Sequence, residues 1–495
     1  MRLRMPVLIA IVLTSHGSLV AAGDAAESRA VQAIERLGAI VERESKSPGR
    51  PVIGIRFKEG SNFGDEQVPL LTSLTKLQTL DLSNTNVCGT RIRGSGLGEL
   101  RALEHLTSLN LRGSKISDAG MYQLAELRGL ESLDLGANEI TDAGLKELRQ
   151  LKNLTRLDLD GSKITDAGLL VIKEFRKLRF LDLNYAGITG AGMRQLGGLE
   201  NLEELWLSKT NIADAGLKEL RGLKKMKTLA LYSAQVTDAG LAEIKDLKNL
   251  TILNLESNRI TDAGLRELKD LTHLERLFLG STQVTDAGLT HLKSLANLQM
   301  LLLDQAHIKD AGLRDLTGLT SLTTLRLSNT EITDAGLKHL SGLKNLTDLG
   351  LGGTPITDSG LKELGGLANL TGLGLNSTHI TDAGLKHIKG LKNLTTLGLG
   401  QTHISDLGLK ELGGFKQLTR LDLTETQITD AGLRELANFD SLETLNLSDT
   451  KITYAGVAPL TKLKSLTNLD LSGTLVTESG VRALKKSVPN VEFAQ

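Results

Sequence analysis

Residues 260–265 read Ile-Thr-Asp-Ala-Gly-Leu, one copy of a phrase that recurs every 24 residues from Ile116 to Val476. These two positions are 360 residues apart, which is 15 periods and therefore 16 copies. All 16 copies carry Gly four residues after the Ile or Val, and 13 carry Asp two residues after it. A fixed period of this length predicts stacked, nearly identical units rather than one globular core.

The unit at residues 201–224 shows how each repeat should fold. Leu205 and Leu207 alternate with other residues, the period-two pattern of a short strand with one buried face. The same strand recurs one repeat away in the same direction, so we expect a parallel sheet with strands about 4.8 Å apart. Leucines at helical spacing between residues 217 and 223 predict a short helix that closes the core from the other side.

The polar and small positions of the unit have local structural interpretations. We interpret Asp214 as the helix N-cap, whose carboxylate accepts a backbone N–H two or three residues on. Gly216 then lets the start of the helix lie close to the strand layer. Thr210 stands in the turn, where its hydroxyl can bond backbone groups that the turn leaves unpaired. The recurring Asp could also form a metal ladder, but capping explains each copy locally.

The pattern L-x-x-L-x-L-x-x-T-x-I-T-D-A-G-L-K-x-L resembles the leucine-rich repeat family over about residues 51 to 495. It is similar to the ribonuclease-inhibitor-like and cysteine-containing subclasses, and still more to secreted bacterial leucine-rich repeat proteins. The resemblance implies an α/β fold, a right-handed solenoid shaped as a horseshoe or arc. Its parallel β-sheet would line the concave face and its short helices the convex face. It implies little about function, because the family binds very different partners.

Four segments are predicted along the chain. Residues 1–22 read as a signal peptide, with Arg2 and Arg4 before a short apolar run and small residues at 20–22. The alternative for this stretch is a buried N-terminal strand. Residues 23–50 should form a helical cap, residues 51–488 a solenoid of about 18 units that is regular from about residue 103, and residues 489–495 a closing segment. We therefore expect an exported bacterial protein, in the periplasm, at the cell surface or outside the cell.

The ends and the interruption of the array give further expectations. Residues 24–47 are predicted to be helical and to cover the open end of the solenoid. Residues 491–493 should supply a closing strand fragment at the other end. An insertion at residues 86–96 adds five residues to one period and holds Cys88, the single cysteine of the chain. One cysteine excludes a disulfide framework or a cysteine zinc site within one chain, and we expect it to be buried.

Charge and length exclude two classes of partner. Lys and Arg total 58 and Asp and Glu total 58, so the formal net charge is zero and the chain has no global basic footprint. Non-specific binding to nucleic acid or to an anionic membrane is therefore disfavoured. The N-terminal apolar run of eight residues is too short to span a bilayer, so no membrane insertion is predicted.

The strand positions that face away from the core carry the differences between repeats. Large apolar residues at these positions near the middle of the chain predict a partner-binding patch, since exposed apolar patches and Trp or Tyr mark interaction sites. The predicted patch is Phe180, Trp206, Tyr232, Ile252, Phe278, Met300 and Leu302. Its predicted acidic rim is Asp158, Asp182, Glu204, Glu256 and Asp304. Relaxed drift in a neutral repeat would also explain these residues.

Two other groups of residues leave alternatives open. Asp134, Asp158 and Asp182 stack in successive repeats and could recruit a hard cation such as calcium, although Arg156 can neutralise them. A run of glycines on later strands of the same face could admit a ligand backbone or could reflect recent duplication of one unit: Gly350, Gly372, Gly374, Gly398 and Gly400. No metal and no cofactor is predicted.

The sequence therefore predicts a non-enzymatic, exported scaffold that binds a protein or peptide on its concave face. An envelope or matrix protein that self-associates through its long repeat surface is the alternative. A ubiquitin-ligase-like substrate-recognition protein, or a secreted effector that uses Cys88 as a nucleophile, is more distant, because no paired His lies near Cys88 in sequence.

Overall fold

The computed structural model describes residues 14–46, 49–58, 61–86, 96–488 and 491–494. The charged and apolar parts of the predicted signal peptide, and Cys88 within the insertion, lie outside the described residues. The chain divides into two compact units, which we call unit 1 (residues 1–226) and unit 2 (residues 227–495).

Unit 1 contains eight strands among its described residues, and all pairings from β2 to β8 are parallel and in chain order. The strands are β1 (Ala39–Arg43), β2 (Val52–Phe57), β3 (Thr79–Asp81), β4 (Ser108–Asn110), β5 (Ser132–Asp134), β6 (Arg156–Asp158), β7 (Phe180–Asp182) and β8 (Glu204–Trp206). The α-helices are α1 (Thr14–Arg36), α2 (Asp118–Leu124), α3 (Asp142–Glu147), α4 (Asp166–Ile172) and α5 (Ala213–Lys218). The 3-10 helices are η1 (Asp65–Ser73), η2 (Ser83–Asn86), η3 (Leu97–Ala102), η4 (Leu148–Gln150) and η5 (Met193–Gln195).

Unit 2 continues the same plan, with parallel pairing from β9 to β20. Its strands are β9 (Thr228–Ala230), β10 (Ile252–Asn254), β11 (Arg276–Phe278), β12 (Met300–Leu302), β13 (Thr324–Arg326), β14 (Asp348–Gly350), β15 (Gly372–Gly374), β16 (Thr396–Gly398), β17 (Arg420–Asp422), β18 (Thr444–Asn446), β19 (Asn468–Asp470) and β20 (Glu492–Ala494). Its α-helices are α6 (Asp238–Ile244), α7 (Asp262–Leu268), α8 (Asp286–Leu289), α9 (Asp334–Leu337), α10 (Asp358–Leu364), α11 (Asp406–Leu412), α12 (Leu433–Leu436) and α13 (Glu478–Ser487). Its 3-10 helices are η6 (Thr290–Leu292), η7 (Gly312–Leu316), η8 (Lys338–Leu340), η9 (Gly384–Ile388), η10 (Tyr454–Gly456) and η11 (Ala458–Lys462).

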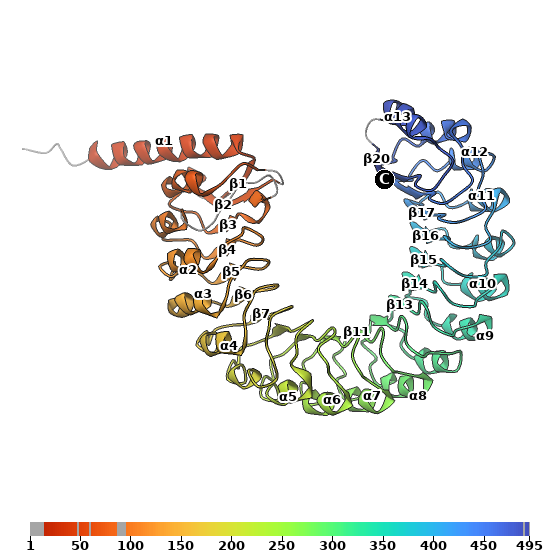
Figure 1. The fold of residues 1–495 in the computed structure, drawn as a ribbon, viewed down its shortest axis with the longest axis horizontal. Helices are drawn as coiled ribbons and strands as arrows, with labels where there is room; N and C mark the ends of the chain where they lie inside the picture. The colour runs from red at the N-terminus through yellow and green to blue at the C-terminus, as the bar shows by residue number, and fades with distance from the viewer. Residues whose placement is uncertain (1–13, 47–48, 59–60, 87–95, 489–490, 495) are drawn as a thin grey trace, which may run out of the picture. The chain divides into compact units, whose positions relative to one another are not determined.

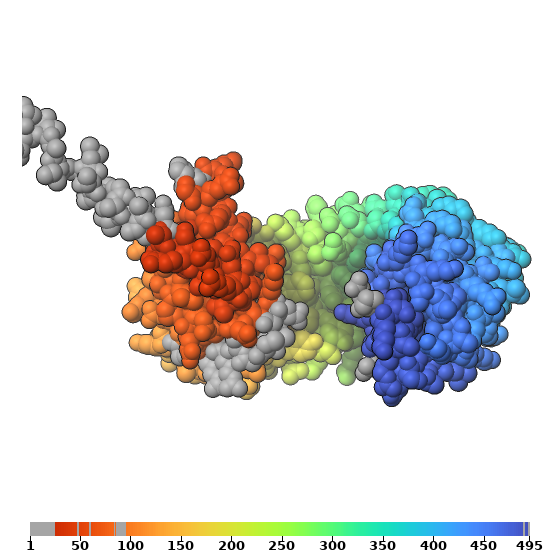
Figure 2. Space-filling view, turned by 90° about the horizontal axis from the view of Figure 1, so that it is seen from above, coloured from red at the N-terminus to blue at the C-terminus, as the bar shows by residue number. Residues whose placement is uncertain are grey.

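The core lies between the strand layer and the helices. Within each unit the helices lie on one side of the strands (Figure 1). Leu253, Leu277 and Leu301 are Cα partners on β10 to β12 and are fully buried, as the alternation of the sequence predicts. In the space-filling view the repeats at the C-terminal end of unit 2, coloured blue, pack directly against one another (Figure 2). The predicted α/β solenoid of leucine-rich repeats is therefore confirmed.

The N-terminal cap differs from the predicted single helix. Helix α1 ends at Arg36, and residues 39–43 form β1, which pairs antiparallel with β2. Ile34 on the helix is buried, and Val41 on the strand is Cα partner to Ile55. The prediction of a helix to residue 47 was therefore wrong. Ile34 and Val41 are seven residues apart, and two apolar residues at this spacing can lie on one face of a single helix. They can equally lie one on a helix and the other on the strand that follows it. The closing strand at the other end is confirmed, since β20 pairs parallel with β19.

The recurring Asp does not cap its own helix, which corrects the interpretation of the repeat. In α7 the N-cap is Thr261, whose hydroxyl accepts the backbone N–H of Ala263 at 3.3 Å, and Asp262 is the first helical residue. For α5 the N-cap position is Ile212, so Asp214 lies inside the helix. Thr210 does bond as expected, because its hydroxyl donates to the Leu207 carbonyl at 2.5 Å.

Where the Asp is present, its carboxylate instead bonds the next repeat, as Asp238 shows. Asp238 Oδ1 accepts the backbone N–H of Thr261 at 2.8 Å, and Asp238 Oδ2 accepts the Thr261 hydroxyl at 2.6 Å. Gly264 is required beside this contact, because an added Cβ would clash with Asp238 Oδ1. We call this arrangement the Asp–Thr–Gly clasp. The threonine hydroxyl serves both as helix cap and as donor to the preceding repeat.

At one contact between neighbouring repeats of unit 1, both the Asp and the Thr of the clasp are replaced. Gly190 replaces the Asp, and Ala213 of the next repeat replaces the Thr. The backbone of the next repeat occupies the space that an Asp side chain would need. A Cβ at Gly190 would lie 2.6 Å from the Ile212 carbonyl oxygen and 3.0 Å from the Gly216 nitrogen. Ala213 adopts a left-handed backbone conformation with φ of 48°. This junction is therefore held by close backbone packing.

Substitution of the clasp tests its contribution to stability. We expect Asp262→Ala to lower the free energy of unfolding by about 2 kcal/mol, because the Thr285 N–H and hydroxyl lose a charged acceptor. Gly190→Asp restores the consensus residue but should also destabilise, by about 1–3 kcal/mol, because the backbone leaves no room for a side chain. Both values are measured by denaturant titration.

Asp270→Ala is the matched control, because this exposed carboxylate makes only a surface ion pair with Lys248 at 3.8 Å. An Asp262→Ala protein as stable as this control would show that the clasp does not stabilise the repeat stack.

Candidate functional site

The side of the strands that faces away from the buried leucines and the helices is the candidate interaction surface, which we call the strand face. Every residue of the predicted patch lies on it or in the turn just after it, half-buried rather than fully exposed. Phe180 and Trp206 belong to unit 1, and the other five residues belong to unit 2. The structure thus gives two separate groups, and each is described within its own unit.

In unit 1 the two aromatic residues have different surroundings. The Arg156 guanidinium stacks on the Phe180 ring, 3.3 Å from its centroid, and so covers part of it. The Trp206 side chain is half-buried, and its indole Nε1 is buried with no hydrogen-bond partner among the described residues. Glu204, a predicted rim residue, lies two residues before Trp206 on β8.

In unit 2 four large apolar side chains occupy three neighbouring strands. Ile252 and Met300 flank Arg276 in one register row, and Phe278 and Leu302 are direct Cα partners in the next row. Opposed side chains on adjacent strands lie about 5 Å apart, so Phe278 and Leu302 are neighbours, and Ile252 and Met300 lie in the row beside them. We call Ile252, Phe278, Met300 and Leu302 the β10–β12 patch.

Two residues of the predicted rim, Glu256 and Asp304, lie in unit 2 beside this patch, whereas Asp158 and Asp182 of the same predicted rim are buried in unit 1. Glu256 and Asp304 flank Gly280, and a Cβ at Gly280 would lie 2.9 Å from Glu256 Oε1 and 3.2 Å from the Asp304 carbonyl oxygen. Burial raises the pKa of Glu256 and the charge of Asp304 raises it further, while a hydrogen bond with Asn254 opposes the shift. Tyr232 lies in the same row on the β9 side and is half-buried.

One of the stacked aspartates of unit 1, Asp158, belongs to an ion-pair network. Asp134, Asp158 and Asp182 are Cα partners on β5, β6 and β7. Asp158 and Asp182 are only 6% and 8% exposed. Arg112 lies 3.5 Å from Asp158 and also bonds Asp160, and Arg156 lies 3.8 Å from Asp158. The sequence indicated Arg156 as the neutralising residue but missed Arg112, which reaches across two repeats.

Burial dominates the protonation of this network. It raises the pKa of Asp134 and of Asp158, and it raises the pKa of Asp182 to about 7, with Asp158 and Asp160 adding to the shift. The hydrogen bond from Asn184 and the charge of Arg112 oppose the shift at Asp182. Among the described residues no three His, Cys, Asp or Glu side chains are arranged to hold a metal ion, so the ladder gives no support for a calcium site.

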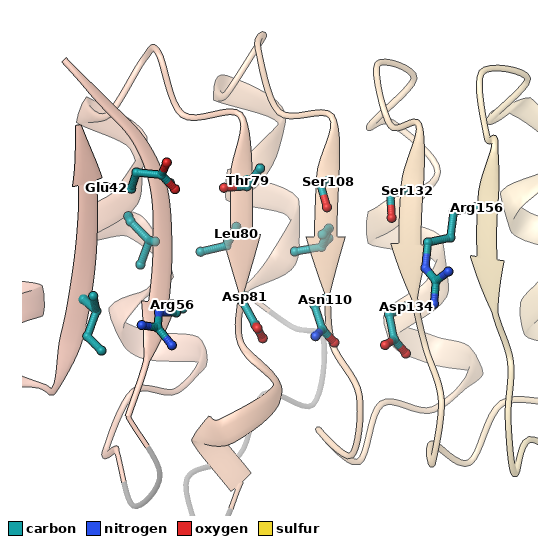
Figure 3. A pocket seen from close by; sticks show the side chains of 14 residues that line it. Glu42, Arg56, Thr79, Leu80, Asp81, Ser108, Asn110, Ser132, Asp134 and Arg156 are labelled. Carbon is teal, nitrogen blue, oxygen red and sulfur yellow. The ribbon is translucent and has the colours of Figure 1, made fainter. Parts of the chain in front are cut away.

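A polar hollow of about 440 Å³ lies on the strand face of unit 1, over β1 to β6. Asp81, Asn110 and Asp134 stand side by side on neighbouring strands (Figure 3). Each is oriented because its Oδ1 accepts a backbone N–H two residues further on, at 2.9–3.0 Å. The second row of the hollow is formed by Thr79, Ser108, Ser132 and Arg156 (Figure 3).

A second hollow, of about 390 Å³, lies on the strand face of unit 2 where the sequence has its glycine run. Gly372, Gly374 and Gly398 form its floor on β15 and β16. Arg326 pairs with Asp348 at 2.8 Å on one side, and Arg420 lies on the other. Because glycine has no side chain, the strand backbone in this floor is open to a ligand.

Comparison with protein families matches three leucine-rich repeat models to separate parts of the chain. They are "Leucine rich repeat" at residues 104–164 and 368–428, "Leucine Rich repeats (2 copies)" at 248–294, and "Leucine Rich repeat" at 318–341, 342–365 and 441–460. No curated protein matches the sequence.

Solved structures match the fold. A leucine-rich repeat protein of Leptospira interrogans is 25% identical, with a TM-score of 0.55, and the alignment covers 75% of this chain and 92% of that chain. An internalin of Listeria monocytogenes is also 25% identical, with a TM-score of 0.49, and covers 72% and 94% of the two chains. The parallel strands, the repeated clasp, the family models and the match to the Leptospira interrogans protein define an α/β leucine-rich repeat solenoid. The chain belongs to the leucine-rich repeat family.

The family is in general a binding scaffold, whose repeats mediate protein–protein interaction, and nothing in the described residues indicates catalysis. No described helix has both the length and the apolar character that are needed to cross a bilayer.

The raised pKa of Asp182 predicts a pH-dependent stability. Its pKa of about 7 in the folded state lies above the ordinary value near 3.8, so the folded state holds more protons between these values and stability falls as pH rises from about 4 to 7. Asp182→Asn should remove this slope and stabilise the protein at pH 8 by about 1–2 kcal/mol. Thermal unfolding at pH 5, 6.5 and 8 measures it, and an equal slope in both proteins would contradict the assignment.

Proposed function

We propose that the chain is a protein-binding scaffold whose strand face recognises a protein or peptide partner. The β10–β12 patch is the observation that carries the proposal. Its four apolar side chains face away from a core that is already filled by Leu253, Leu277 and Leu301, so packing inside the repeat does not require them. Apolar groups of this size on a solvent-facing surface are typical of interaction sites.

The surroundings of the patch fit a protein partner. An apolar centre with charged neighbours, here Arg276, Glu256 and Asp304, matches the usual anatomy of an interface. Phe278 lies on β11, the middle strand of the three, with Leu302 as its Cα partner on β12, and binding energy usually concentrates at the centre of an interface. In unit 1, Trp206 is a half-buried aromatic side chain on β8, and we propose its ring as a second contact.

Site-directed photo-crosslinking tests the proposal. A photoreactive phenylalanine at position 278 should capture a partner that the same residue at position 454 does not, because Tyr454 is 52% exposed on a 3-10 helix away from the strands. Phe278→Ala with Leu302→Ala should weaken binding of that partner at least tenfold, since both substitutions remove apolar contact area. Affinity is measured with the purified partner.

Tyr454→Ala with Leu407→Ala is the matched control, because both side chains are exposed, large and apolar. Equal capture at positions 278 and 454, or equal affinity of the two double variants, would refute the patch. Trp206→Ala is measured separately and reports on the contact proposed in unit 1.

We also propose that the chain is exported from a bacterial cell. Support comes from the sequence of residues 1–22, with basic residues, a short apolar run and small residues before Gly23. N-terminal sequencing of the protein purified from its cells should begin near Gly23. A retained Met1 would contradict export through this signal.

A further inference from the structure

In the glycine-floored hollow of unit 2, the fold does not require glycine at position 374. A Cβ at Gly374 would meet only ordinary van der Waals neighbours, at 3.8 Å from Gly350 Cα and 4.0 Å from the Leu349 carbonyl oxygen. Gly374 has no left-handed backbone angle that would demand glycine. Gly398 differs, because a Cβ there would lie 2.5 Å from Asn376 Oδ1. Glycine at position 374 therefore leaves open space over the strand, and it is not needed to avoid a clash.

One end of this hollow has hydrogen-bond donors without acceptors. Arg420 lies between Thr396 and Thr444 as their Cα partner on the neighbouring strands. Within the described parts of the chain Arg420 forms no ion pair, and neither threonine hydroxyl has a hydrogen-bond partner. Asn446 lines the hollow, and its Oδ1 accepts from the Ser448 N–H and hydroxyl at 2.8–2.9 Å, so its amide N–H groups are not used in these bonds.

The acceptors nearby are already in use. Asp422 Oδ1 accepts the Thr424 N–H at 3.0 Å and the Thr424 hydroxyl at 2.6 Å, and Asp422 Oδ2 accepts the Asn376 amide at 3.1 Å. On the other side of the hollow, Asp348 is neutralised by Arg326 at 2.8 Å. At its Arg420 end the hollow therefore offers a guanidinium, two hydroxyls and an amide to a ligand. A carboxylate complements these donors, while the Asp422 carboxylate in the same lining stays bonded to Thr424 and Asn376.

We propose that this hollow binds an extended peptide segment that carries an acidic side chain. The Asp or Glu carboxylate of the segment pairs with Arg420 and bonds Thr396, Thr444 and Asn446. The main chain of the segment passes over Gly374, where only a backbone without facing side chains allows close approach. The inference rests on the proposed protein-binding role of the strand face and names the chemistry of the segment that the hollow binds.

A display library of random 12-residue peptides, fused at their C-terminus so that no free terminal carboxylate is present, is the probe. Panning on the full chain should enrich peptides with a shared Asp or Glu. We expect these peptides to bind Arg420→Glu at least tenfold more weakly, and panning on Arg420→Glu should select Lys or Arg instead. Gly374→Val fills the hollow without a backbone clash and should also lower the affinity at least tenfold.

Two controls match these substitutions. Arg434→Glu makes the same charge change at an exposed arginine on α12, and Gly318→Val adds the same side chain where nothing lies within 4 Å. Neither should change peptide binding. Peptides without a shared acidic residue, unchanged binding by Arg420→Glu, or no enrichment at all would each overturn the inference.

The outcomes also separate this site from the β10–β12 patch. If Phe278→Ala with Leu302→Ala releases the crosslinked partner while Arg420→Glu has no effect on the peptides, the proposed function stands and the acidic-segment site falls. If Arg420→Glu releases the peptides while the patch variant keeps its partner, the patch falls and the hollow remains a binding site.

Discussion

The Asp–Thr–Gly clasp sets the geometry on which the rest of each unit depends. A charged oxygen of one repeat binds the N–H and hydroxyl that begin the next helix, as Asp334 does with Thr357 at 2.8 and 2.6 Å. The glycine of that next helix gives the carboxylate its space, as Gly360 does beside Asp334. Because each clasp joins only neighbouring repeats, it fixes their spacing one pair at a time. Each strand can then pair in register, and each buried leucine meets its counterpart.

A core and a clasp that repeat in this way leave the strand face free to vary. In unit 2 this face carries an apolar patch on β10 to β12, an Arg326–Asp348 ion pair and a glycine-floored hollow that ends at Arg420. In unit 1 it carries a polar hollow and the buried Asp158, which lies beside Arg112 and Arg156. A buried charge costs stability unless it is paired, and these two arginines supply the pairing.

Much of this could be predicted from the sequence, because a 24-residue period repeats every local signal many times. The strands, the buried leucines, the turn threonine and the closing strand β20 all followed from periodicity. The positions of Phe278 and Leu302 on the solvent side followed as well. The role of Asp was misread because its partner, Thr, lies 23 residues away, while the helix N–H groups that it was expected to cap lie two or three residues away.

The sequence by itself determined the fold class and which residues face the core, since both depend on a short pattern that the chain repeats. Only the tertiary structure decided which polar groups meet across repeats. Arg112 reaches Asp160, 48 residues on, and Asn376 reaches Asp422, 46 residues on. It also showed that Gly374 has room for a side chain while Gly190 has none. These contacts depend on side-chain direction and on the space between adjacent strands, and neither is encoded in the spacing of the repeat.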